Sequence, residues 1–196
     1  MEESRRMGLA VLGPDVNESQ YTFAVNKKGE IRFGLGAILG LGSAPVDAIV
    51  SDRIKNGNYD SVFDLSKRIN LRVCNTTSFK NLAYAGAFDS FKNCHRSQFF
   101  VEDINGRSFL DKVLSFGANY QTEKESIQIS IFGEETEVSL PEPEYPEAEP
   151  WNSLTKLTKE KEVVGVFISG HPLDDHKHEI KAFCNATVSM LSKPNE

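Results

Sequence analysis

Two glycines that flank a single apolar residue, Gly40-Leu41-Gly42, form the feature that most constrains how this chain folds. They lie at the centre of residues 32–55, whose apolar pattern predicts a helix, a tight turn and a second helix. Glycine lets the chain reverse sharply, and the amides of the turn and of the following helix N-terminus are then free to meet a phosphate. The segment therefore favours nucleic-acid backbone binding over catalysis. A ligand-free turn between two packed helices is the alternative that this spacing also allows.

The charge of the chain is concentrated in separate segments. The net charge is −6, yet residues 27–96 carry eleven basic and six acidic side chains, whereas residues 97–196 carry nine basic and eighteen acidic ones. Lysine and arginine supply the counterion-release term of DNA binding, so the basic middle segment suits DNA. The candidate DNA contacts around the first turn are Gly40, Leu41, Gly42, Ser43, Arg32, Arg53 and Lys55. Around a second glycine turn at residues 85–88 the candidates are Gly86, Lys80, Lys92 and Arg96, where a plain solvated surface is an equal explanation.

The rest of the pattern predicts a mainly α fold. Strand-like runs at 21–25 and 30–33 predict a small N-terminal β-hairpin. We expect Ser43 to be the N-cap of the helix after the first turn, and Ser61 with Asp64 to form a capping box for the next helix. Further helices are predicted at about 75–84, from about His95, from Ser108, and within 153–168 and 173–183.

An acidic stretch follows the predicted helical region. Residues 134–150 hold seven glutamates, four prolines and no basic residue, so they are predicted to be a linker. Immediately before it lies the peptide Gln128-Ile129-Ser130-Ile131-Phe132-Gly133. An aliphatic-aromatic pair beside a flexible stretch is typical of a peptide that docks into a partner's apolar pocket, with Gln128, Ile131 and Phe132 as the anchors. Alternatively, Ile131 and Phe132 fold back onto their own domain.

No active site is predicted. A nucleophile motif, a phosphate-binding loop and paired catalytic carboxylates are all missing from the sequence. The His, Asp and Glu residues within 171–179 resemble a metal site, but they fit a helix start and a solvated surface better. We therefore expect no catalytic residue, metal or cofactor. Cys74, Cys94 and Cys184 are odd in number and far apart, which indicates reduced thiols. The lack of a long apolar run predicts a cytoplasmic protein without a membrane segment.

Five segments together carry a resemblance to a known family. In chain order they resemble the part of the bacterial DNA polymerase III α subunit family that follows the catalytic palm. The segments are VLGPDVNES at 11–19, IRFGLGAILGLG at 31–42, LAYAGAFDSF at 82–91, QISIFG at 128–133 and EKEVVGVFISGHPLDDH at 160–176. This resemblance covers nearly the whole chain. The stretch from Asn70 to Asn81 departs from it, because it is less basic than a DNA-binding segment is expected to be.

The resemblance implies a division into four parts. Residues 1–33 would end the fingers region, and 34–116 would form a tandem helix-hairpin-helix domain that grips duplex DNA. Residues 117–150 would hold the linker and the sliding-clamp motif, with Gln128, Ile131 and Phe132 as its anchors. Residues 151–196 would lead toward an OB-fold domain. No segment resembles the palm, so Mg²⁺-dependent polymerisation would belong to other parts of the parent protein.

The partners implied are duplex DNA, the sliding clamp, and other domains and subunits of the polymerase. Two other hypotheses remain at this point. The chain could be a protein-interaction scaffold within the polymerase that does not touch DNA. It could also be a metal-dependent hydrolase that uses the cluster at 171–179.

Overall fold

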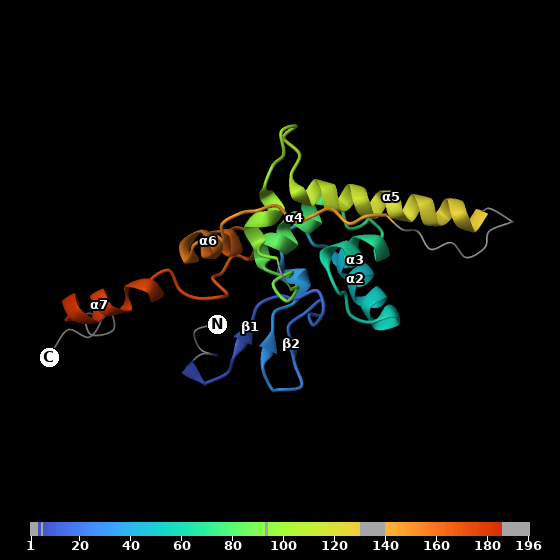
Figure 1. Cartoon of the computed structure of the whole chain (residues 1–196). Coiled ribbons are helices and arrows are strands. Elements are labelled where there is room, and N and C mark those ends of the chain that lie inside the picture. The colour runs from blue at the N-terminus through green and yellow to red at the C-terminus, as the bar shows by residue number, and fades with distance from the viewer. Residues whose placement is uncertain (1–3, 5, 93, 130–139, 186–196) are drawn as a thin grey trace.

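The computed structural model describes residue 4 and residues 6–92, 94–129 and 140–185. Most of the regular structure is helical, which confirms the predicted fold class (Figure 1). In chain order the elements are β1 (Val11–Leu12), β2 (Ala24–Val25), β3 (Ile31–Arg32), the 3₁₀ helix η1 (Leu35–Ala37), α2 (Ser43–Asn56), α3 (Val62–Arg68), α4 (Thr76–Ala85), the 3₁₀ helix η2 (Arg96–Phe100), α5 (Phe109–Ile129), α6 (Ser153–Val164), the 3₁₀ helix η3 (Asp174–His176) and α7 (Lys177–Phe183).

The predicted β-hairpin is present as part of a three-stranded sheet. β2 and β3 pair antiparallel, with Val25 opposite Ile31. The sheet order is β1-β3-β2, because β1 adds to the other edge of β3 in parallel, with Val11 opposite Ile31. This parallel pairing was not predicted, since it joins residues that are 20 positions apart and leaves no local turn signal.

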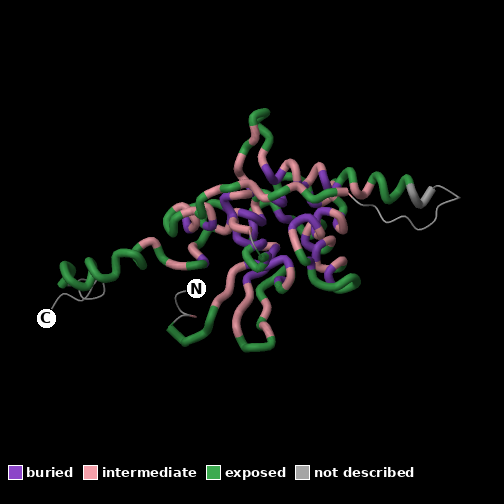
Figure 2. Tube along the Cα trace, viewed as in Figure 1, coloured by how far each residue is buried: buried purple, intermediate pink, exposed green. Residues whose placement is uncertain are grey.

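One hydrophobic core joins the helices. It contains buried side chains from Val16 to Val163 and includes a group of aromatic rings in edge contact, such as Phe63 with Phe109 and Phe116. Figure 2 shows the buried residues gathered between α2, α3, α4 and the first half of α5, whereas α7 and the far end of α5 are exposed. α6 also packs against α4, so this C-terminal helix belongs to the same packed body.

The helix predicted before the first glycine turn is only the three-residue η1. Two glycines explain the difference. A Cβ on Gly34 would lie 2.5 Å from the Thr22 backbone, and one on Gly36 would lie 2.8 Å from the Tyr21 ring. These glycines allow residues 20–22 to cross closely, and they do not extend a helix. The N-cap of α2 is Gly42 and not Ser43, which is the first helical residue.

Several helix starts follow local capping signals. Ser61 caps α3 by accepting the Asp64 amide at 3.1 Å, which confirms the predicted helix start. The reciprocal bond of a capping box differs, because the Asp64 carboxylate accepts the Asp60 amide at 3.3 Å and not that of Ser61. Asn75 caps α4 in the same way. The helix predicted from His95 is wrong in extent, because η2 ends at Phe100 and a bridge between Glu102 and Ser108 follows it.

Residues 140–150 are not a free linker. Leu140 and Tyr145 pack against the core, and the Tyr145 ring lies 5.1 Å from that of Phe109. Side chains of η2 also bind this segment, because Gln98 and Ser97 donate to the carbonyls of Pro146 and Glu149. Apolar and backbone contacts therefore hold residues 140–150 to the body despite their charge. The predicted linker residues 134–139 lie outside the described residues.

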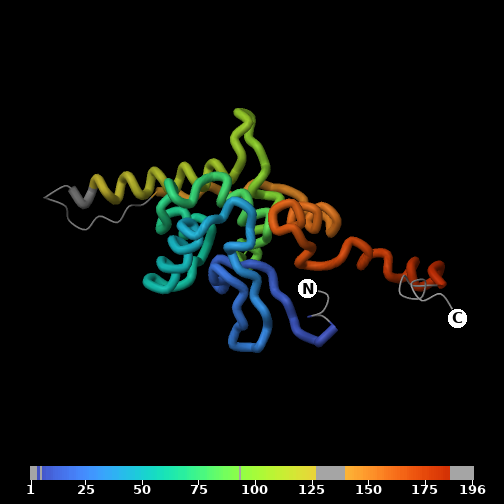
Figure 3. Tube along the Cα trace, turned by 180° about the vertical axis from the view of Figure 1, so that it is seen from behind, coloured from blue at the N-terminus to red at the C-terminus, as the bar shows by residue number. Residues whose placement is uncertain are grey.

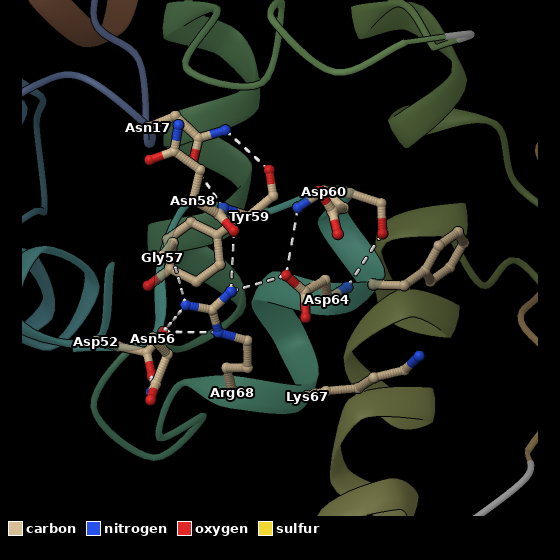
Figure 4. A network of polar contacts seen from close by, with 12 residues as sticks. Asn17, Asp52, Asn56, Gly57, Asn58, Tyr59, Asp60, Asp64, Lys67 and Arg68 are labelled. Atoms are coloured by element: carbon tan, nitrogen blue, oxygen red, sulfur yellow. Dashed lines mark hydrogen bonds and ion pairs between the residues drawn. The ribbon is translucent and has the colours of Figure 1, made fainter. Parts of the chain in front are cut away.

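The connection between α2 and α3 is fixed by Arg68, as Figure 4 shows. Its guanidinium donates to the carboxylates of Asp52 and Asp64 and to the carbonyls of Gly57 and Asn58, at 2.7–3.1 Å. It also lies over the Tyr59 ring, 4.3 Å from the centroid. This arginine is therefore fully used within the fold.

Candidate nucleic-acid interface

The Gly40-Leu41-Gly42 turn exposes its two glycines at the protein surface. Gly40 has φ +74°, the left-handed conformation that favours glycine. Leu41 is buried, and its amide donates to the Ile38 carbonyl at 3.1 Å. Among the described residues, no acceptor is recorded for the amides of Gly40, Gly42, Ser43 or Ala44. Leu41 is thus the anchor of the turn and not a phosphate contact, whereas the other predicted turn residues keep donors for an anion.

Two helices hold this turn in place. The Asn81 side chain of α4 donates to the Leu39 carbonyl at 2.7 Å, and the Leu39 amide donates to the Val163 carbonyl of α6 at 2.8 Å. A Cβ on Gly40 would lie 3.2 Å from the Asn81 amide nitrogen. Asn81 therefore positions the turn. This is a structural role for the end of the stretch from Asn70 to Asn81 that the sequence did not reveal.

The arginines predicted near the first turn are used inside the protein. Arg53 is 8% exposed, and its guanidinium donates to the carbonyls of Val16 at 2.6 Å and Ser19 at 2.8 Å. Arg32 donates to the Gly13 carbonyl and pairs with Glu18. Both guanidinium groups thus already have partners within the protein, and their contact with DNA stays a prediction that these bonds do not favour. Lys55 is exposed, but it lies twelve residues along α2 from Ser43, about 18 Å at the rise of an α-helix.

The second glycine turn is closed off by Arg96. Gly86 is buried with φ +83°, and a Cβ at this position would lie 2.0 Å from Arg96 Nη2. Because Arg96 covers the turn and is itself 8% exposed, Gly86 and Arg96 are not available to a phosphate. Their contact with DNA therefore stays a prediction that this burial does not favour. Lys92 is exposed and stays a candidate.

Arg96 instead ties α6 to the second turn. It pairs with Asp89 at 2.7 Å and with Glu160 at 2.9 Å. Glu160 is 1% exposed and also accepts the amides of Ile168 and Ser169. Burial lowers the pKa of Arg96, but the hydrogen bonds and charges of the two carboxylates outweigh it and leave this pKa raised. The charge on Arg96 is therefore compensated within the fold.

Two lysines lie together beside this region on α4 and α6. Lys80 Nζ is 5.9 Å and Lys159 Nζ is 5.1 Å from the centroid of the Tyr84 ring. Lys80 was a predicted DNA contact and is exposed. Lys159 was missed because it lies in the acidic C-terminal part of the chain. The one signal in the sequence that could have indicated Lys159 was its spacing from Lys156 within the helical pattern of 153–168.

One of the three predicted clamp anchors falls at the far end of α5. Gln128 lies in the last turn of this helix, whereas Ile131 and Phe132 lie outside the described residues. Residues 122–126 are exposed, and Figure 1 and Figure 3 both show this end of α5 extending away from the body. The clamp motif therefore stays a prediction.

The described residues of the 171–179 cluster are held by local contacts. The Asp174 carboxylate accepts the His171 amide at 2.6 Å and pairs with Lys177 at 3.0 Å. The hydrogen bond from the His171 amide has the larger effect on the pKa of Asp174 and lowers it, and the hydrogen bond from Lys177 lowers it further. No group of three or more metal-binding side chains occurs within the described part of the chain. All three cysteines are free thiols. In the same residues, no helix has the length and apolarity to cross a membrane.

The sequence of this chain is similar to those of known proteins. Residues 8–99 match the helix-hairpin-helix motif family. The chain is 32% identical to the DNA polymerase III subunit alpha of Escherichia coli strain K12 over 196 residues, which is 100% of this chain. It is a homologue of part of the bacterial DNA polymerase III alpha subunit.

Other relatives give the same result. The subunit of Vibrio cholerae is 32% identical over 190 residues, and that of Deinococcus radiodurans is 37% identical over 177 residues, or 90% of this chain. The chain spans only 16% of the length of the Escherichia coli and Vibrio cholerae relatives and 13% of the Deinococcus radiodurans one.

Proposed function

We propose that this chain binds the backbone of duplex DNA within a replicative polymerase. The observation that carries the proposal is the exposed turn with unused amides at Gly40, Gly42, Ser43 and Ala44, held from behind by Asn81 and Val163. Such amides at a helix N-terminus form an anion site, and the positive end of the helix dipole adds to it. The helix-hairpin-helix match over residues 8–99 and the polymerase homology support this assignment.

The binding would not depend on DNA sequence. Backbone amides and lysines contact phosphates, which are identical at every base pair. Lys80 and Lys159 flank the side of the turn formed by α4 and α6 and would add salt-dependent attraction. Polymerase catalysis and its Mg²⁺ would reside in other parts of the parent protein. DNA as the partner places the protein in the bacterial cytoplasm.

We further propose that Gln128, Ile131 and Phe132 anchor the chain to the sliding clamp. Residues 122–126 of α5, which lead toward this peptide, are exposed. Holding DNA and clamp at once raises the effective concentration of polymerase at the primer end, which is a route to processivity.

The test of DNA binding is a pair of substitutions at Ser43. Ser43→Pro removes one donor at the first helical position, where proline is tolerated, and Gly42 already has the extended backbone (φ −72°, ψ −178°) that precedes proline. Ser43→Ala keeps the amide and is the control. A hydrogen bond to a charged group contributes about 1.5–3 kcal/mol, so Ser43→Pro should weaken duplex binding about tenfold or more.

Fluorescence anisotropy with a labelled duplex over a salt series measures this effect. Equal affinities of the Ser43→Pro and Ser43→Ala variants would remove the turn from the DNA interface. If the parent chain itself shows no duplex affinity at about 50 mM salt, where phosphate contacts are strongest, the scaffold hypothesis replaces DNA binding.

The clamp is tested separately by calorimetry. Phe132→Ala should abolish binding of the chain to the purified clamp and leave the duplex affinity unchanged. Clamp affinity equal to that of the parent would exclude this peptide as the anchor.

A further inference from the structure

Three aromatic rings form a cluster at the surface where α4, η2 and the start of α6 meet. The Tyr84 and Phe100 rings are nearly parallel, at an interplanar angle of 5° with their centroids 4.2 Å apart. Trp151 lies 5.4 Å from Phe100 and 6.0 Å from Tyr84, inclined by 20° and 24°. All three residues are half-buried. Tyr84 and Phe100 also pack against the hydrophobic core, so the cluster lies at the edge of the core with part of each residue exposed.

Lysines surround this aromatic cluster. Lys80 and Lys159 lie over the Tyr84 ring, and Lys156 lies on the same helix as Lys159. The acidic groups beside them have partners, because Glu162 pairs with Lys159 at 2.9 Å and Asp89 pairs with Arg96 at 2.7 Å. Asp89 also lies 3.7 Å from Lys156. Of the three lysines, only Lys80 forms no ion pair with a described residue, whereas Lys156 and Lys159 face Asp89 and Glu162. Glu147 and Glu149 are exposed on the segment that leads to Trp151, so the cation available to a phosphate here is Lys80.

A hollow of about 270 Å³ opens beside Trp151. It is lined by Trp151, Pro150, His95, Cys94, Arg96, Asp89 and Lys156. Pockets for drug-sized ligands usually measure about 300–1,000 Å³, so this hollow suits a single flat ring system better than a complete cofactor. An aromatic residue, Trp151, and a cationic one, Lys156, are both among its lining residues.

We propose that this aromatic cluster and the adjacent hollow bind unpaired bases of single-stranded DNA. Aromatic side chains beside lysines are the common platform for such strands, since every base has a face that stacks and every nucleotide brings a phosphate. A duplex cannot use the platform, because its bases are already stacked on each other. The site lies beside the proposed duplex-binding turn, with Lys80 and Asn81 adjacent on α4. A junction between single-stranded and duplex DNA fits both sites.

The test uses Trp151, the only tryptophan in the chain. A base that stacks on this ring should quench its fluorescence. The probe is an oligodeoxythymidylate of about twelve nucleotides, within the site size of single-strand binding domains. An abasic strand of equal length and a blunt duplex are the comparisons. We expect quenching by the thymidylate strand and little quenching by the other two.

Variants then test the two chemical components with a labelled thymidylate strand. Trp151→Ala should weaken binding about fivefold or more, the loss expected for one stacked base. Lys80→Gln with Lys159→Gln should weaken binding and lower its salt dependence. Lys27→Gln with Lys28→Gln removes the same charge from the exposed turn between β2 and β3, and it should have a smaller effect.

Several results would overturn the proposal. These are an absence of quenching by the thymidylate strand, equal quenching by the abasic strand or the duplex, and equal losses in the two lysine pairs. The lysine variants decide the matter if Trp151→Ala does not fold. Ser43→Pro should keep single-strand quenching, so a failure of the duplex proposal is distinguishable from a failure here.

Discussion

Replacing Arg96 by methionine should destabilise the fold strongly, because the change strands a buried carboxylate. Glu160 is 1% exposed and loses the guanidinium that now lies 2.9 Å away. Removing one partner of a buried ion pair costs about 3–5 kcal/mol. Glu160 keeps the amides of Ile168 and Ser169, so we expect the lower end, about 3 kcal/mol. Asp89 is 40% exposed at its side chain and adds little, since water replaces the lost partner.

Urea and thermal unfolding followed by circular dichroism measure this loss. A loss of about 3 kcal/mol corresponds to a fall in Tm of about 6–12 °C for a chain of this size. The double variant Arg96→Met, Glu160→Met should recover much of the loss, because no charge is then left buried. Arg72→Met, at an exposed position, is the matched control and should stay within about 0.5 kcal/mol of the parent.

The reasoning fails if Arg96→Met costs less than about 1 kcal/mol, or if the double variant is no more stable than the single one. A second readout separates stability from DNA contact. At a temperature where Arg96→Met is folded, its duplex affinity should equal that of the parent, since Arg96 is occupied by Asp89 and Glu160. A tenfold loss of affinity there would restore Arg96 as a phosphate ligand.

Three further predictions concern other parts of the fold. Ser61→Ala should lower the free energy of unfolding by about 1 kcal/mol in urea titrations through loss of the α3 cap, whereas no change would deny the cap a role. Tyr145→Ala should release residues 140–150 and speed their proteolysis, and an unchanged cleavage rate would contradict their anchoring by this ring. With a thiol reagent at pH 8, exposed Cys184 should react first. Burial raises the pKa of Cys74 to about 12 and that of Cys94 to about 11, so both thiols should react more slowly than Cys184. Equal reaction rates of the three cysteines would contradict the burial of Cys74 and Cys94.

The sequence was informative wherever the cause of a structure is local. The capping pair at Ser61 and the β2–β3 hairpin depend on residues a few positions apart, so both were predicted correctly. The glycine spacing placed the first turn for the same reason, and the ordered motifs placed the chain in its polymerase family. The helix predicted before this turn was wrong because its cause is not local: Gly34 and Gly36 allow a close crossing by residues 20–22, which the apolar pattern does not reveal.

By itself, the sequence determined the mainly α fold, the exposed glycine turn and the family. Only the tertiary structure decided which cations are free. Arg53 is consumed by carbonyls 37 and 34 positions away, and Arg96 by a carboxylate 64 positions away. It also decided that residues 140–150 pack and that Lys159 joins Lys80 over Tyr84. Composition counts charges, but a charge can bind DNA only if the fold leaves it without an internal partner.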